Sequence, residues 1–299
     1  MSVGRLTVIG IGLIGGSFAR AVRRGGAAGE IVGCSTDAAE LRSAVDLGVI
    51  DRAEAHPAAA ARGADLVMIA TPVGAMPAVF REIADVLGEE TILSDTGSVK
   101  GSVVAAARAC LGRHFPRFVA GHPIAGTERS GVAASLPDLY VGQRVILTPE
   151  PETRADAIST VRALWEAAGA RVEQMPAREH DAILAHTSHL PHMVAYALVN
   201  CLGGAEPASE LLRFAAGGFR DLTRIASSHP VMWRDIALAN REDLLRALRA
   251  YQGSLGEIIT AIEQADAAAL EEIFARARAL RERLGNAGQG NDQSKIRAP

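Results

Sequence analysis

The stretch L-T-V-I-G-I-G-L-I-G-G-S, residues 6–17, decides the fold of this 299-residue chain. An apolar run leads directly into Gly10-x-Gly12-x-x-Gly15, and an alanine-rich helical pattern follows. In such a turn the first glycine permits a tight bend, the second lets a pyrophosphate approach bare backbone, and the third lets the helix pack closely on the strand. The helix N-terminus then points unpaired N–H groups at the phosphates. The stretch therefore predicts a strand–turn–helix unit that binds a dinucleotide.

The alternation of strand and helix continues beyond this turn. The pattern predicts strands at 30–34, 66–70, 91–94, 144–147 and 170–174, with a further strand from residue 117. Helices are expected at 16–24, 76–87, 99–109 and 153–168, and another follows Asp37, which has capping-box spacing to Glu40. Repeated units of this kind form a parallel sheet with helices on both faces, the Rossmann-type doubly wound α/β class. We expect this dinucleotide-binding domain to cover residues 1–176.

The second half of the chain has a different pattern. Apolar residues recur at helical spacing over 178–202, 206–226, 230–251 and 253–284, without a convincing strand. This predicts an all-helical domain over 177–284, whose surplus apolar faces pack on a second copy in a homodimer. Residues 285–299, rich in Gly, Asn and Gln, have the composition of a disordered tail.

Composition excludes several classes of protein. The net charge of −3 and the lack of a Lys/Arg stripe argue against nucleic-acid binding. Three well-separated cysteines (Cys34, Cys110, Cys201) do not form a disulfide framework and favour a reducing compartment. No apolar run is long enough for a membrane span, and the first strand begins too early for a signal peptide. We expect a cytoplasmic location.

The loops at 71–73, 95–100 and 121–128 follow strands, and the carboxyl ends of strands line the ligand crevice in open sheets. His122, between Gly121 and Pro123, has the right side chain to accept a proton from an alcohol as hydride leaves for a nicotinamide. Ser98 either orients that imidazole or caps the helix that follows it. Lys100 is read as a solvated first-turn residue.

The choice of nicotinamide cofactor stays open. NAD-binding domains usually carry an acidic residue about 20 residues past the glycine turn. Here Ser35 and Thr36 close the second strand, and Asp37 either faces the ribose or caps a helix. We lean slightly to NAD over NADP. The predicted cofactor-binding residues are Gly10, Gly12, Leu13, Ile14, Gly15, Ser35, Thr36, Thr71, Pro72, Asp95 and Gly97.

Two further clusters are candidates for substrate contact. His186, His189 and His192 recur every three residues, which is compatible with substrate contact, core packing or, less readily, a metal site, because a third ligand at standard spacing is missing. Arg220 and Arg224, four residues apart, form either a grip for a dianionic carboxylate or a surface ion-pair network. Trp233 is read first as a core residue.

The motifs G-I-G-L-I-G-G-S, D-T-G-S-V-K, G-H-P-I-A-G-T-E, S-H-L-P-H, G-F-R-D-L-T-R-I-A and M-W-R-D occur in this order between residue 8 and about residue 240. Together they resemble the prephenate/arogenate (cyclohexadienyl) dehydrogenase family. The resemblance implies oxidative decarboxylation of prephenate or arogenate in tyrosine biosynthesis, with hydride transfer to NAD or NADP and no metal. It also implies an intertwined homodimer formed by the helical domain.

The resemblance assigns roles to matching positions. His122 takes the proton of the ring hydroxyl, Ser98 bonds both groups, and Arg224 holds the ring carboxylate. The other implied substrate-site residues are Thr127, Glu128, His189, His192, Gly217 and Trp233, with Gly217 or Trp233 a candidate to come from the neighbouring subunit. Whether Glu128 reaches the side chain that distinguishes arogenate from prephenate stays open, as does inhibition by tyrosine.

Three alternatives were weighed against this interpretation. A 3-hydroxyacid dehydrogenase with a helical dimer domain would need a lysine in the second domain, but the only lysine after Lys100 is Lys295 in the tail. A nucleotide-sensing module would bind cofactor without turnover. A metal-dependent hydrolase built on the histidine triplet would have no use for the glycine turn.

Overall fold

The computed structural model describes residues 2–127, 129–204 and 213–289, and within 284–289 only the backbone. The chain forms two compact units, Met1–Leu244 and Leu245–Pro299. Every site residue discussed below belongs to the first unit.

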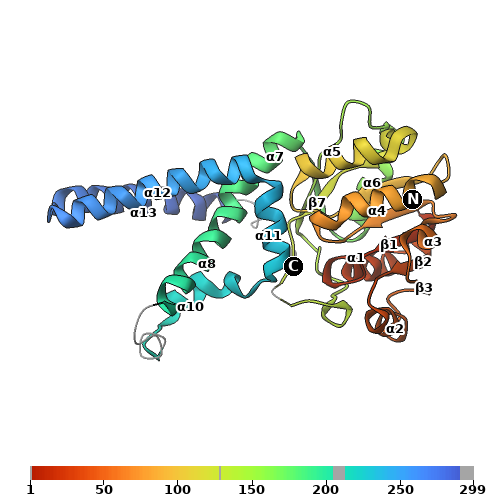
Figure 1. Cartoon of the computed structure of the whole chain (residues 1–299), viewed down its shortest axis with the longest axis horizontal. Coiled ribbons are helices and arrows are strands. Elements are labelled where there is room, and N and C mark those ends of the chain that lie inside the picture. The colour runs from red at the N-terminus through yellow and green to blue at the C-terminus, as the bar shows by residue number, and fades with distance from the viewer. Residues whose placement is uncertain (1, 128, 205–212, 290–299) are drawn as a thin grey trace, which may run out of the picture. The chain divides into compact units, whose positions relative to one another are not determined.

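A six-stranded sheet forms the centre of the first unit (Figure 1). Its strands are β1 (Val3–Ile9), β2 (Ala28–Cys34), β3 (Arg52–Glu54), β4 (Leu66–Ile69), β5 (Ile92–Asp95) and β6 (Phe118–Val119). They lie in the order β3-β2-β1-β4-β5-β6, and each neighbouring pair is parallel. The chain order reverses between β1 and β4, and ligands bind at such a switch point in open α/β sheets. The glycine turn follows β1 and therefore lies at this point.

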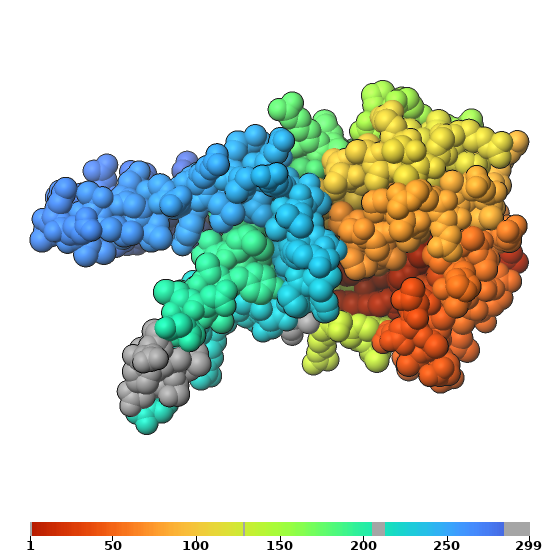
Figure 2. Space-filling view, viewed as in Figure 1, coloured from red at the N-terminus to blue at the C-terminus, as the bar shows by residue number. Residues whose placement is uncertain are grey.

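Helices cover both faces of the sheet, as the alternating pattern predicts. Buried side chains of α1 (Leu13–Arg24), α2 (Ala38–Asp46) and α6 (Ala155–Ala167) join one core with Leu6 and Val8. Those of α3 (Pro57–Ala61), α4 (Met76–Ile83) and α5 (Lys100–Leu111) join the other core with Ile9. Strand residues alternate between the two cores because successive side chains of a strand point to opposite faces. The ridges of α4 (orange) and α5 (yellow) lie side by side on the near surface in Figure 2.

A second, three-stranded sheet departs from the parallel arrangement. It contains β7 (Gly121–Pro123), β8 (Arg144–Leu147) and β9 (Arg171–Gln174), in that order. β7 runs antiparallel to β8, with His122 opposite Ile146, whereas β8 and β9 are parallel. This sheet holds His122 in regular extended backbone.

The start of α2 corrects one sequence interpretation. The Asp37 carboxylate accepts the N–H groups of Ala39 and Glu40 and so caps the helix. Glu40 does not complete a capping box. Its carboxylate instead accepts the backbone N–H of Val132 at 2.6 Å, in a loop far along the chain.

After β9 the described residues form helices joined by short turns, in agreement with the sequence pattern. These elements are α7 (Ala177–Leu184), a π-helical turn (Ala185–His189), α8 (Leu190–Gly203), α10 (Gly217–Thr223), a 3-10 turn (Arg224–Ser227), α11 (Pro230–Ala239), α12 (Arg241–Glu263) and α13 (Ala267–Gln289). None of the helices in the described residues is long and apolar enough to cross a membrane.

Two predicted helix boundaries are wrong. The pattern places a break near residue 252, but α12 runs through that position, and the breaks fall at Asn240 and at Ala265, which has a φ of +51°. α13 continues to Gln289, into the predicted tail, and residues 290–299 lie outside the described residues. Of the helix expected over 206–226, residues 206–212 are likewise outside them.

Candidate active site

The glycine turn between β1 and α1 has the geometry of a dinucleotide cradle. Gly10 has a φ of +95°, and a Cβ there would lie 2.6 Å from the carbonyl carbon of Ala70. A Cβ at Gly15 would lie 2.0 Å from the Gly10 carbonyl oxygen. A Cβ at Gly12 would meet nothing within 4 Å, so this position faces open space where a ligand can approach the backbone. These residues fit the predicted dinucleotide.

The other predicted cofactor residues surround this turn or have contacts within the chain. Thr71 follows β4, and its buried hydroxyl has no hydrogen-bond partner among the described residues, so it can serve a ligand. The Ile14 carbonyl accepts the Tyr140 hydroxyl at 2.7 Å, and Leu13 is buried. Ser35 accepts the Asp37 N–H at 3.1 Å, whereas Thr36 is exposed. Pro72 precedes a 3-10 turn, Val73–Ala75.

A buried ion pair anchors the loop after β5. Lys100 is fully buried, and its Nζ lies 2.5 Å from Asp95 Oδ2 and 2.6 Å from the Gly121 carbonyl oxygen. Asp95 also accepts the N–H groups of Gly97 and Gly121. The interpretation of Lys100 as a solvated residue is therefore wrong. Asp95, predicted to contact the cofactor, has both carboxylate oxygens engaged by this chain.

The anchor brings the loop of His122 to the edge of the sheet where β5 ends. The Gly121 N–H donates to Asp95 Oδ1 at 3.1 Å, at the last residue of β5. Further along the same loop, a Cβ at Gly126 would lie 3.9 Å from Ile14 Cδ1 in the first turn of α1. The histidine loop and the glycine turn therefore lie together at the carboxyl edge of the parallel sheet, as the crevice rule predicts.

His122 belongs to a line of three side chains. Its Nδ1 lies 2.8 Å from His180 Nε2, and His180 Nδ1 lies 2.7 Å from Asp181 Oδ1. Asp181 also accepts the N–H groups of Lys100 and Gly101, each at 2.7 Å. The helix α5 is thus capped by a carboxylate from α7.

This arrangement corrects the capping alternative for Ser98. The residue preceding α5 is Val99, and it makes no side-chain capping bond. Within the described residues, no hydrogen bond joins the Ser98 hydroxyl to His122 either. Ser98 is half-buried in the loop between Asp95 and α5, so its predicted contact with substrate stays a prediction.

The histidine triplet divides between core and surface. His189 is buried and lies 3.1 Å from the amide nitrogen of Asn240, whereas His186 is exposed. The rings of His192 and Trp233 stack with centroids 3.7 Å apart, and His189 meets Trp233 edge-on at 6.0 Å. Trp233 packs on His189 and His192 of its own chain and joins a small apolar cluster, as its core interpretation predicts. Among the described residues, no three His, Cys, Asp or Glu side chains are placed to hold a metal ion.

Three of the remaining predicted substrate residues lie in α10 or in the 3-10 turn that follows it. Arg224 is exposed, and its charge acts on His192. Arg220 lies in the last turn of α10, Gly217 begins that helix, and both are exposed. Thr127 is exposed and accepts the Arg129 N–H at 3.2 Å, and Glu128 lies outside the described residues.

The electrostatics keep the histidines neutral. Burial, assisted by the neighbouring His180, Lys100 and His189, holds the pKa of His122 well below its ordinary value of 6.5. Burial lowers the pKa of His189 to about 4. For His192, burial also lowers the pKa, and the charge of Arg224 adds to this. A neutral imidazole with a free nitrogen can accept a proton.

Sequence reasoning missed His180, Asp181 and Asn240. No local pattern marked His180 and Asp181, because the contacts that identify them join α7 to β7 and to α5. Asn240 accompanies them: its amide nitrogen lies 2.8 Å from the Asp181 carbonyl oxygen and 3.1 Å from His189 Nδ1.

The fold and the site together define a dinucleotide-dependent oxidoreductase. Residues 18–174 match the family described as prephenate dehydrogenase, nucleotide-binding domain, and residues 176–276 match prephenate dehydrogenase, dimerization domain. The chain belongs to the prephenate dehydrogenase family.

Similar proteins agree with this assignment. A cyclohexadienyl dehydrogenase of Zymomonas mobilis is 39% identical over 275 residues, which cover 90% of this chain and 92% of that protein. A prephenate dehydrogenase of Bacillus subtilis is 37% identical, over 93% of this chain and 76% of that protein. The crystal structure of prephenate dehydrogenase from A. aeolicus, in complex with hydroxyphenyl propionate and NAD+, superposes with a TM-score of 0.87 at 38% identity, over 95% of this chain and 99% of that chain.

Proposed function

We propose that this protein catalyses the oxidative decarboxylation of prephenate, arogenate or both in tyrosine biosynthesis. One observation carries the proposal: a neutral imidazole, His122, is held on a strand beside the carboxyl edge of the parallel sheet, where the glycine turn also lies. NAD or NADP, when bound, accepts the hydride that leaves ring carbon C4. The names of the relatives support the substrate class.

His122 moves one proton in each direction. As C4 is oxidised, the hydroxyl O–H bond breaks and an N–H bond forms on the imidazole, which becomes positively charged. The ring carboxylate then leaves as CO₂, and the electron pair of its C–C bond passes into the ring and forms a phenolate. The imidazolium can return its proton to that phenolate oxygen, so the chemistry at His122 balances without a metal.

Arg224 is the proposed anchor of the ring carboxylate. It is exposed, its charge acts on His192, and the His192 ring stacks on Trp233. Charge-assisted hydrogen bonds of this kind contribute about 1.5–3 kcal/mol. We assign Ser98, Thr127, Glu128, His189 and Gly217 to the same substrate region, and we keep the expectation that Gly217 or Trp233 also serves a neighbouring subunit.

The cofactor turn fits either nicotinamide dinucleotide. Asp37 is exposed at the end of β2, and only one of its carboxylate oxygens, Oδ1, accepts the capping N–H groups. The other oxygen can accept a ribose hydroxyl, and an adjacent negative charge disfavours a 2′-phosphate. This supports a preference for NAD.

The assembly and location follow from the same assignment. The match of residues 176–276 to a dimerization domain supports a homodimer formed by the helical region. The three cysteines are free, which suits the predicted cytoplasm.

The proposal is tested by following absorbance at 340 nm with prephenate and arogenate, each combined with NAD and NADP. Turnover in at least one of the four combinations is expected, and the pattern assigns substrate and cofactor. Absence of turnover in all four, with cofactor binding intact, would contradict the proposed reaction.

The role of His122 is tested by His122→Ala. Loss of the proton acceptor should lower kcat by roughly 10²–10⁴-fold, because that is the usual contribution of general acid–base catalysis. NADH affinity, measured by fluorescence titration, should not change. Near-normal turnover by this variant would show that another group takes the proton.

A further inference from the structure

The side chains of His122, His180 and Asp181 form a line that starts at the proposed base. Both ring nitrogens of His180 have a partner in this line. The two contacts measure 2.8 Å and 2.7 Å. His180 is completely buried, so water does not compete for its nitrogens. The order of donors and acceptors along this line can therefore be worked out from its end.

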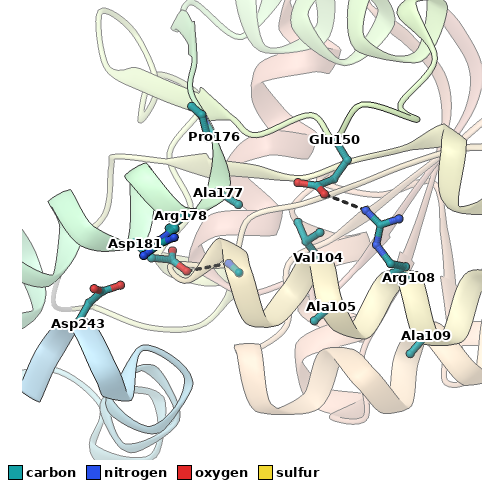
Figure 3. A pocket seen from close by; sticks show the side chains of 11 residues that line it. Val104, Ala105, Arg108, Ala109, Glu150, Pro176, Ala177, Arg178, Asp181 and Asp243 are labelled. Atoms are coloured by element: carbon teal, nitrogen blue, oxygen red, sulfur yellow. Dashed lines mark hydrogen bonds and ion pairs between the residues drawn. The ribbon is translucent and has the colours of Figure 1, made fainter.

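Asp181 fixes that end as an acceptor. Oδ1 accepts the Lys100 N–H and Oδ2 accepts the Gly101 N–H, each at 2.7 Å. Burial alone would raise the pKa of Asp181, but the hydrogen bonds from His180 and from these two N–H groups outweigh it and lower the pKa. Figure 3 shows Asp181 at the wall of a pocket, hydrogen bonded to the backbone at the start of α5. The carboxylate is therefore ionised and can only accept protons.

The carboxylate determines both histidine tautomers. His180 must carry its proton on Nδ1 in order to donate to Asp181 Oδ1. In the neutral ring, Nε2 then has a lone pair and accepts from His122. His122 in turn must carry its proton on Nδ1, which leaves the lone pair on Nε2, the nitrogen not engaged by His180. That is the nitrogen a proton-accepting imidazole needs.

We propose that His180 and Asp181 are positioning residues that hold His122 in the tautomer with the proton on Nδ1 and the lone pair on Nε2. The inference rests on the proposed function, which makes His122 the base. Asp181 also stabilises the imidazolium through His180, in the way that a buried carboxylate serves the histidine of a Ser-His-Asp triad. Since Asp181 caps α5 as well, one carboxylate holds both the helix and the imidazole line in place.

Other charged and titratable groups face this line. Lys100 and His189 oppose protonation of His122. For His180, Lys100 opposes protonation, whereas Asp181 and Asp95 favour it. Burial is the largest cause for both rings: it adds to the effect of the neighbouring charges on His122, it exceeds the opposing effect of Asp181 and Asp95 on His180, and both pKa values are lowered. Each neutral ring therefore has one N–H donor and one nitrogen lone pair.

The direct test is ¹⁵N NMR of the full-length, cofactor-free protein labelled at histidine. The His122 signals are identified by their loss in His122→Gln. We expect a neutral ring protonated on Nδ1 for both His122 and His180. A His122 ring protonated on Nε2 would overturn the proposal. This readout needs no substrate, so a protein that fails to oxidise prephenate and arogenate but has the expected tautomers would refute the proposed function alone.

The kinetic test replaces His180 by a ring of similar size without nitrogen. His180→Phe should lower kcat by roughly 10²-fold or more, because His122 loses the acceptor that fixes its tautomer. KM for substrate and NADH affinity should be unchanged. His114→Phe is the matched control, since His114 is also buried but its ring is hydrogen bonded to Arg113, outside the line of His122, His180 and Asp181.

Equal kcat for His180→Phe and the unsubstituted enzyme would overturn the proposal. A loss of kcat that His114→Phe reproduces would do the same, because any buried histidine would then suffice. If His180→Phe does not fold, the NMR tautomers of the unsubstituted protein decide.

Discussion

A single buried cation, Lys100, connects three parts of the site. Its ammonium group binds Asp95 at the end of β5 and the Gly121 carbonyl at the start of β7, and its backbone N–H donates to Asp181. Burial lowers the pKa of Lys100, and the adjacent Asp95 opposes this effect. A buried ion pair is costly to break because the remaining partner keeps an uncompensated charge.

We therefore expect Lys100→Met to destabilise the protein strongly. Removing one partner of a buried ion pair costs about 3–5 kcal/mol of unfolding free energy. The measurement is urea unfolding of the cofactor-free protein, followed by circular dichroism. Arg108→Met is the control, since Arg108 forms its ion pairs with Glu150 and Glu152 on the surface and should lose little. Equal midpoints for Lys100→Met and the unsubstituted protein would refute the structural role of the buried pair.

Lys100 and His180 illustrate what the sequence alone could not reveal. His122 could be predicted as the base because its surroundings are local: a strand end between glycine and proline. The burial of Lys100 depends on Gly121, and the capping of α5 depends on Asp181, 81 residues away from Lys100. No periodicity or spacing reports a contact of that range, so the positioning residues were missed although His122 itself was predicted as the base.

At the level of elements, the turn between β1 and α1 requires glycine for two different reasons, close packing within the protein at Gly15 and access for a ligand at Gly12. Gly15 has no room for a side chain, because a Cβ would meet the Gly10 carbonyl and the side chains of Ala70 and Val8. Gly12 has room within the protein and has an ordinary extended backbone, with φ −72° and ψ −155°. A Cβ at Gly12 would therefore clash only with a bound ligand.

This contrast predicts opposite results for two alanine substitutions. Gly15→Ala should destabilise the cofactor-free protein by about 1–3 kcal/mol, the usual cost of overpacking. Gly12→Ala should leave the thermal midpoint unchanged but weaken NADH binding by roughly tenfold or more, equivalent to about 1.4 kcal/mol. Each variant is the control of the other, measured by calorimetry and by NADH fluorescence titration. Undiminished NADH affinity in Gly12→Ala would place the dinucleotide elsewhere.

Element prediction succeeded where the signal is repeated along the chain and failed where one residue ends a helix. The alternation of strands and helices identified the sheet, and helical spacing identified the second half. The break at Asn240 has a specific cause outside the local pattern: its amide lies between the Asp181 carbonyl and the His189 ring. A similar local composition without those partners would allow the helix to continue.

At the scale of the whole molecule, the second compact unit exposes apolar side chains that no part of the described chain covers. Tyr251, Leu255, Ile259 and Ile262 recur at spacings of four, four and three on α12, and each is at least 41% exposed. Such spacing places them on one face of the helix. Phe274 and Leu280 on α13 are also exposed. Contiguous apolar surface of this kind marks a protein interface.

The homodimer proposed above accounts for this face, and it can be tested by mass. Size-exclusion chromatography with light scattering should give twice the chain mass of 31.3 kDa. Leu255→Asp combined with Ile259→Asp should give the single-chain mass, because two carboxylates would be buried without partners at the interface. Leu47→Asp is the control, since Leu47 is as exposed as Ile259 (46% against 48%) but lies in the first unit. A monomeric unsubstituted protein, or a doubly substituted protein that stays dimeric, would exclude the α12 face as the contact.

The same variant tests whether the partner subunit contributes to the site. The rings of Trp233 and His192 already stack within one chain. A monomeric variant that keeps turnover would therefore show that no partner residue completes the site.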